Sequence, residues 1–110
     1  MTAGIKQIEQ FVTEHIHENI TLDMLSGYVY LSRFHFSREF KKMTGETPKT
    51  FIINTKIQYA EQLLINSDLK IREIAEQVGY EPERFCSLFH QKTGHTPTAY
   101  RVRYRRETSL

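Results

Sequence analysis

Residues 29–48, VYLSRFHFSREFKKMTGETP, return in altered form 49 positions later, where residues 78–97 read VGYEPERFCSLFHQKTGHTP. The two stretches align without a gap, and both end in T-G-x-T-P. The positions that are identical in the two copies are, in the numbering of the first, Val29, Phe36, Phe40, Thr44, Gly45, Thr47 and Pro48. A unit of about 50 residues that occurs twice predicts two copies of one supersecondary element.

The residues that lead into each of these stretches, 22–29 and 71–78, have the pattern of a short buried helix. Apolar or small residues recur at i, i+3, i+4 and i+7, which places them on one face of a helix. They are Leu22, Leu25, Ser26 and Val29 in the first copy and Ile71, Ile74, Ala75 and Val78 in the second. These periods predict one short helix in each copy.

A turn and a second helix follow in each copy. Ser32 and Glu81 are the expected caps of the second helices, and Pro82 follows Glu81 at a first helical position. These helices end before the glycines of the two T-G-x-T-P sequences, and each Thr-Pro pair then caps and starts another helix. The spacing is typical of a helix-turn-helix.

The predicted fold class is therefore all-α. We expect a first helix-turn-helix over about 20–45, a linker helix over about 48–65, a second helix-turn-helix over about 69–94 and a C-terminal helix over about 97–106. The linker has a partly apolar face, formed by Ile52, Lys56, Tyr59, Ala60, Leu63 and Leu64.

Length and composition narrow the class of protein. A chain of 110 residues has the size of one domain with a modest core. Its 39% hydrophobic and 25% charged residues are typical of a folded soluble protein. Cys86 is the single cysteine, which excludes an intramolecular disulfide, and the chain lacks a signal sequence or an apolar run long enough to cross a bilayer. We therefore expect a cytoplasmic location and no membrane partner.

The charges alternate in sign along the chain. Residues 32–56 carry six cations and two acids, and residues 84–106 carry six cations and no acid. Residues 1–31 and 57–83 have net charges of −3 and −4. Two basic blocks are typical of a surface that binds a polyanion, and segregation of charges on solvated helix faces would produce the same pattern.

The second helix of the first copy has two different faces. Phe36, Phe40 and Met43 recur on the face that we expect to be buried. The opposite stripe carries Phe34, Ser37, Arg38 and Lys41. Arginine can bond a guanine edge and an apolar group can touch a thymine methyl, so this stripe suits a DNA major groove. The alternative is that the cations are solvated and the exposed ring packs on a neighbour.

The motifs together resemble the AraC/XylS family of bacterial transcription regulators, specifically its two-module DNA-binding domain. The resemblance runs from about Ile5 to Tyr104. It rests on V-x-L-S (29–32), F-S-R-x-F-K-K (36–42), G-x-T-P (45–48), K-I-x-x-A-x-x-L-L (56–64), I-x-x-I-A-x-x-V-G-Y (71–80) and T-G-x-T-P-x-x-Y-R (93–101). It implies seven helices, of which the third and sixth enter adjacent segments of the major groove, and transcription activation through RNA polymerase.

Double-stranded DNA is thus the predicted partner. The linker could hold the two reading helices near one DNA turn apart, about 34 Å. Base readout is assigned to Arg33, Phe34, Ser37, Arg38, Glu83, Arg84 and Ser87, and contact with the DNA backbone to Lys41, Lys42, Lys49, Lys92 and Arg101. The chain is either a standalone regulator or the output domain of a longer parent chain with an N-terminal sensor or receiver domain.

The second copy departs from the family pattern. It has one residue fewer between Val78 and Phe89 than the family usually shows, and Cys86, Ser87, His90 and Gln91 stand where a serine, an arginine and two lysines are common. Glu83 adds an anion, and Lys56 replaces a more typical arginine without its bidentate geometry. A helical protein-interaction module that keeps the fold without reading DNA is the alternative function.

No catalytic site, metal site or cofactor is predicted. His15 and His17 point to different helix faces, and the chain has no H-E-x-x-H, paired C-x-x-C or phosphate-cradling glycine loop. Cys86 has no histidine beside it in sequence, which favours a small helical residue over a nucleophile. We therefore do not expect an enzyme.

Overall fold

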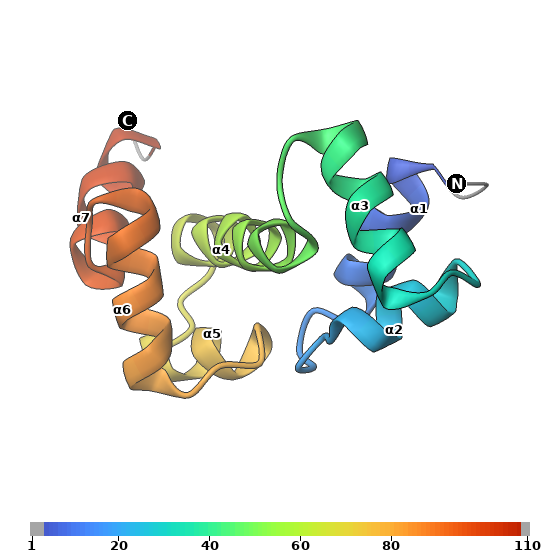
Figure 1. Cartoon of the computed structure of the whole chain (residues 1–110). Coiled ribbons are helices and arrows are strands. Elements are labelled where there is room, and N and C mark those ends of the chain that lie inside the picture. Colours follow the sequence, from blue (N-terminus) through green and yellow to red (C-terminus); the bar gives the residue numbers. More distant parts are fainter. Residues whose placement is uncertain (1–3, 109–110) are drawn as a thin grey trace. The chain divides into compact units, whose positions relative to one another are not determined.

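The computed structural model describes residues 4–108, and the side chains of residues 4–105. Within that range the chain forms seven helices and no strand, which confirms the predicted all-α class (Figure 1). The helices are α1 (Ile5–Glu14), α2 (Leu22–Tyr28), α3 (Arg33–Thr44), α4 (Pro48–Asn66), α5 (Ile71–Gln77), α6 (Pro82–Thr93) and α7 (Pro97–Thr108). The chain divides into two compact units, residues 1–55 and 56–110. In this part of the chain, no helix has the length and apolarity that a membrane span requires.

The first unit contains α1, α2, α3 and the beginning of α4. Its buried apolar side chains come from all four helices, the loop before α2 and the turn after it: Ile8, Val12, Ile16, Ile20, Leu25, Val29, Phe36, Phe40, Phe51 and Ile52. Helix α2 packs against α3. Ser32 caps α3 as predicted, because its Oγ accepts a hydrogen bond from the His35 N–H at 3.1 Å.

One side chain of α3 was assigned to the wrong face. Met43 was expected in the core, but it is 50% exposed. Thr44 is half-buried instead, so the buried stripe of α3 runs at i, i+4 and i+8 from Phe36. A stripe inclined in this way follows the i±4 row of a helix, which drifts from the i+7 position.

The second unit contains the remainder of α4 with α5, α6 and α7. Its buried apolar side chains are Ile57, Ala60, Leu64, Ile74, Ala75, Val78, Phe85 and Phe89. Pro82 begins α6 as predicted, but Glu81 makes no side-chain cap hydrogen bond. Glu81 is the N-cap residue of α6 by position, as predicted, and the lack of a side-chain bond agrees with the preference of N-caps for the shorter side chains of Ser, Thr, Asp and Asn.

The T-G-x-T-P sequences form the same corner in both units. Thr44 Oγ1 lies 2.8 Å from the carbonyl oxygen of Phe40 and accepts from the Glu46 N–H at 3.2 Å. Thr93 Oγ1 lies 2.8 Å from the carbonyl oxygen of Phe89 and accepts from the His95 N–H at 3.2 Å. Gly45 and Gly94, the glycines of the two T-G-x-T-P sequences, follow α3 and α6 with φ angles of 81° and 79°. This is the left-handed conformation that favours glycine at the end of a helix.

The helix after each corner sets a ring against the preceding helix. Phe51 of α4 packs edge-on against Phe40, with ring centroids 5.2 Å apart. Tyr100 of α7 packs in the same way against Phe89, at 5.3 Å. The start of α4 therefore packs against α3 in the first unit in the way that α7 packs against α6 in the second.

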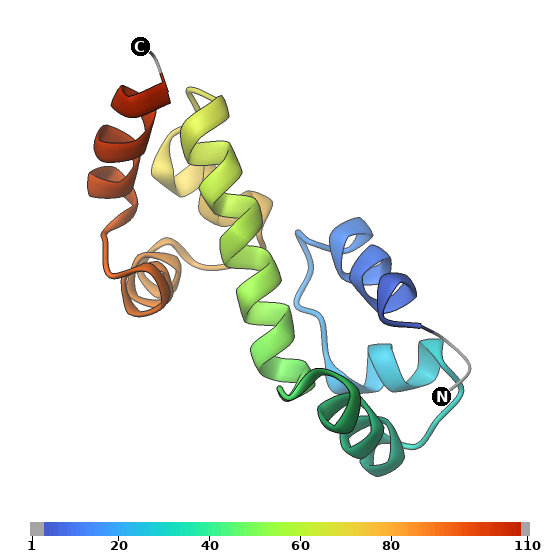
Figure 2. The ribbon, with the colours of Figure 1, turned by 90° about the horizontal axis from the view of Figure 1, so that it is seen from above.

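Helix α4 contributes to both cores as one unbroken helix (Figure 2). Phe51 and Ile52 belong to the first core, and Ile57, Ala60 and Leu64 belong to the second. The partly apolar face predicted from the sequence is largely confirmed, because Ile52, Lys56, Ala60 and Leu64 are buried. Tyr59 lies at the edge of that face and is 36% exposed.

Candidate nucleic-acid interface

The outer face of α3 presents an aromatic ring beside a guanidinium. Phe34 is 74% exposed, and the Arg38 guanidinium carbon lies 5.6 Å from its ring centroid. The two residues are four apart, so their side chains meet on the helix surface. A cation–π contact of this kind restrains the arginine. Ser37, on the same side of the helix, is half-buried.

Arg33, at the first position of α3, is ion-paired with α2. Its Nε lies 3.1 Å from Asp23 Oδ1, and the two side chains are 67% and 72% exposed. An exposed pair contributes about 0–1 kcal/mol, so the guanidinium can exchange Asp23 for another anion at small cost. Sequence reasoning did not single out Asp23, because the pair depends on how α2 packs against α3.

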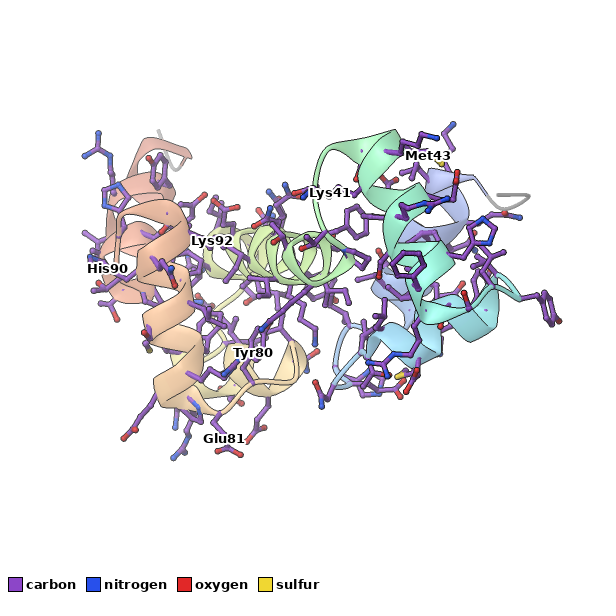
Figure 3. The ribbon with its side chains drawn as sticks, in the orientation of Figure 1. Lys41, Met43, Tyr80, Glu81, His90 and Lys92 are labelled. Carbon is purple, nitrogen blue, oxygen red and sulfur yellow. The ribbon has the colours of Figure 1, made fainter. Side chains whose placement is uncertain are left out.

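The cations assigned to the DNA backbone in the first unit surround the other end of α3. Lys41 and Lys42 are exposed in its last turn, and Lys49 is exposed in the first turn of α4. Figure 3 shows Lys41 and Met43 at this end of α3. Cations in a last turn also stabilise the helix dipole, so a role in folding accompanies any role in binding anions.

The start of α6 has a different arrangement. The Arg84 guanidinium carbon lies 5.7 Å from the ring centroid of Tyr80, and the Lys56 ammonium lies 5.1 Å from the same centroid. Burial raises the pKa of the Tyr80 phenol, and the Arg84 charge acts in the opposite direction. Tyr80 lies in the turn before α6, next to Glu81 (Figure 3). It was missed as a positioning residue because it lies in the turn before α6 and not on a helix, and because its contact with Lys56 depends on how this turn packs against α4.

The rest of the outer face of α6 carries fewer cations than α3. Glu83, Ser87, His90 and Lys92 are exposed, and Cys86 is half-buried. Figure 3 shows His90 and Lys92 toward the C-terminal end of the helix. Glu83 lies in the first turn, where a carboxylate stabilises the helix dipole. In the repeat, Glu83 stands at the position of Phe34, and Ser87 stands at that of Arg38.

Arg101 of α7 faces the protein. Its Nε, Nη1 and Nη2 donate to the carbonyl oxygens of Leu64, Leu69 and Ser67 at 2.9, 2.7 and 3.1 Å. Burial, with a further contribution from the neighbouring Arg105 charge, lowers the pKa of this guanidinium. These donors fix α7 to the segment between α4 and α5, and the contact of Arg101 with the DNA backbone stays a prediction.

The other arginine on this side of α7 is also engaged with that segment. Arg105 forms an ion pair with Asp68. Arg103, between the two, is exposed. Elsewhere, within residues 4–105, no cluster of three or more His, Cys, Asp or Glu side chains is placed to hold a metal ion.

The chain matches known proteins over nearly all of this structure. A family model described as a helix-turn-helix domain matches residues 25–103. The MmsAB operon regulatory protein of Pseudomonas aeruginosa is 37% identical over 99 residues, which cover 89% of this chain and 32% of that protein. The HTH-type transcriptional activator Btr of Bacillus subtilis is 36% identical over 85 residues, covering 77% of this chain and 16% of that protein.

A solved structure matches the fold over nearly its full length. The crystal structure of the DNA-binding domain of AdpA, a global transcriptional factor, in complex with a target DNA has a TM-score of 0.86 and 31% sequence identity, and the match covers 94% of each chain. The present chain thus spans about a third or less of the two regulators and nearly the whole of this domain. It is a DNA-binding domain of the AraC-type family of helix-turn-helix transcription regulators.

Proposed function

We propose that the chain reads duplex DNA with two modules of unequal strength, in which α3 supplies most of the base specificity and α6 mainly docks on the backbone. The observation that carries this proposal is the exposed Phe34–Arg38 pair on α3. The same positions of α6 hold Glu83 and Ser87. The outer face of α6 therefore attracts phosphates more weakly and offers fewer donors to base edges.

On α3 we assign the direct contacts to three side chains. Arg38 bonds a guanine through its O6 and N7 atoms, and Phe34 contacts a thymine methyl. Ser37 can bond either kind of base edge. Because the Phe34 ring already restrains Arg38, less side-chain entropy is lost when the guanidinium binds. Arg33 completes this reader by exchanging Asp23 for DNA.

On α6 the residue best placed to read a base is Arg84, supported by the ring of Tyr80. Glu83 can accept from a cytosine N4 amine. Ser87 lies one turn further along the exposed face. Lys92 and the N–H groups at the start of α6 would hold phosphates here, as Lys41, Lys42 and Lys49 do in the first unit.

Selection of binding sites from random duplex DNA tests the proposal. We expect one well-defined half-site of about 4–6 base pairs and, about one helical turn away, a weakly specified one. Arg38→Ala should reduce the base preference at the well-defined half-site, and Arg84→Ala should reduce it only at the weakly specified one. Two equally sharp half-sites, or a sharp half-site that depends on Glu83 and Arg84, would contradict the unequal assignment.

Because both readers lie in one chain, we further propose that one chain occupies one site. Analytical ultracentrifugation on the selected duplex should find a complex with a single chain across about two turns of DNA. If two chains are required at every protein-to-DNA ratio, the site depends on a dimer and this part of the proposal fails.

A helical protein-interaction module is the second candidate. Glu83 and the cation-poor face of α6 favour it. The salt dependence of binding separates the two functions, since neutralising phosphates releases counterions and the logarithm of the binding constant then falls steeply with the logarithm of salt. A nearly flat salt dependence, or no binding to duplex DNA, would favour the protein-interaction module.

The setting of the domain is also a proposal. The matched regulators are three to six times as long as the matched segment, which supports a parent chain with an N-terminal sensor or receiver domain. One of them is named as a transcriptional activator, which supports activation through RNA polymerase. A regulator of this kind meets the chromosome in the cytoplasm, where we place it.

A further inference from the structure

Tyr30 has an unusual backbone conformation at the turn between α2 and α3. Among residues 4–108, it is the one non-glycine residue with positive φ, at 58°. In this left-handed region the β-carbon crowds the following carbonyl oxygen, a strain that glycine avoids. Tyr30 ends α2 by donating from its N–H to the Gly27 carbonyl at 3.2 Å, while the Leu31 N–H donates to Ser26 at 2.9 Å.

The second unit makes the same turn with glycine. Gly79 has φ of 77° and donates from its N–H to the Glu76 carbonyl at 3.0 Å. The Tyr80 N–H donates to the Ala75 carbonyl at 2.9 Å. Both turns are thus Schellman motifs with the same hydrogen bonds. The backbone of this turn requires no tyrosine.

The core does not require the Tyr30 ring either. Tyr30 is 94% exposed, so the ring adds little packing to offset the backbone strain. A strained residue with an exposed side chain is typical of a functional position. Tyr30 lies two residues before the Ser32 cap, at the end of α3 that also carries Arg33 and the exposed Phe34.

We propose that the Tyr30 hydroxyl donates a hydrogen bond to a DNA phosphate next to the half-site read by α3. This inference rests on the proposed function and adds a backbone contact to it. Tyrosine is among the side chains that bind phosphate oxygens, and the cation of Arg33, three residues further along the chain, draws the same polyanion to this end of α3. Gly79 offers no side chain at the equivalent position, which adds to the inequality of the two modules.

The variants Tyr30→Gly and Tyr30→Phe separate the strain from the hydroxyl. Tyr30→Gly should raise the melting temperature by about 2–4 °C, because glycine relieves the strain. It should also weaken binding about three- to tenfold, as expected when one neutral hydrogen bond is lost. Tyr30→Phe should show the same loss of affinity without a change in melting temperature. The loss should be equal on selected and random duplexes, with an unchanged salt slope, because the hydroxyl carries no charge.

Tyr28→Phe is the matched control, since Tyr28 is the last residue of α2, is 45% exposed and has its ring 4.7 Å from that of Phe11. It should bind DNA like the parent chain. Parental affinity in either Tyr30 variant would overturn the phosphate contact. If Arg38→Ala then still relaxes sequence preference, the proposed function stands and only this inference fails. A parent chain that binds no duplex DNA would overturn both.

Discussion

The Lys56 ammonium nitrogen lies 2.6 Å from the carbonyl oxygen of Val78, inside the second unit. Lys56 is 2% exposed, and Val78 is the C-cap residue that follows α5. The hydrogen bond therefore ties the middle of α4 to the turn that leads into α6. The same ammonium faces the ring of Tyr80, which supports Arg84. A cation on α4 thus helps to position the start of the second reading helix.

Replacing Lys56 with methionine should lower the free energy of unfolding by about 1–3 kcal/mol, because the buried Val78 carbonyl loses a charged donor. Urea unfolding at neutral pH measures the change. Lys49→Met is the control, since Lys49 is exposed on the same helix and its removal should change stability by less than about 0.5 kcal/mol. Equal effects of the two substitutions would show that the Lys56 hydrogen bond contributes nothing specific.

Arg101→Ala should behave as a stability variant. We expect the free energy of unfolding to fall by about 2–4 kcal/mol, because three carbonyls between α4 and α5 lose their donors. Arg101→Lys should recover little of the lost stability, since an ammonium lacks the planar fork of donors that reaches all three carbonyl oxygens. Arg103→Ala, on the exposed side of α7, is the control. If Arg101→Ala left stability unchanged and weakened DNA binding, Arg101 would be a contact to the DNA backbone.

Tyr100 should make stability depend on alkaline pH. Burial raises the pKa of Tyr100 to about 12, helped by its hydrogen bond to Glu61 and by the Glu61 charge. The folded state therefore favours the neutral phenol. Its contribution to stability is complete below pH 10, the ordinary pKa of tyrosine, and is lost as the pH rises from about 10 through 12.

Tyr100→Phe tests this linkage. The stability advantage of the parent chain over the variant should stay constant up to about pH 10 and then shrink toward pH 12. Denaturant unfolding at intervals of pH measures the difference, and absorbance titration of the phenols should lose a step near pH 12 in the variant. A constant advantage over the whole range would mean that Tyr100 titrates alike in both states.

Arg38→Ala should relax sequence preference. On the selected duplex we expect a loss of about 1–3 kcal/mol in binding free energy, with a smaller loss on random DNA, as for a contact with a base edge. Lys42→Ala should weaken both duplexes alike and reduce the salt slope by about 1. Fluorescence anisotropy across a salt series measures both. Equal losses for Arg38→Ala on the two duplexes would make Arg38 a phosphate contact.

The helices could be predicted from the sequence because short-range rules determine them. Gly45 and the Ser32 cap act on backbone groups within four residues, so a local pattern suffices. The contacts of Arg101 could not be predicted in this way, since its three acceptors lie 32 to 37 positions away in the chain. The contact of the Tyr80 ring with Lys56 likewise depends on how the turn before α6 packs against α4.

The continuity of α4 also restricts how the protein can evolve. A loop between repeated modules absorbs insertions and deletions, but α4 carries Phe51 for one core and Leu64 for the other within a single helix. One residue added between them would turn the following side chains by about 100° around the helix axis and move the buried stripe toward solvent. Descendants of this chain should therefore vary in the length of their loops and keep the residue count of α4 constant.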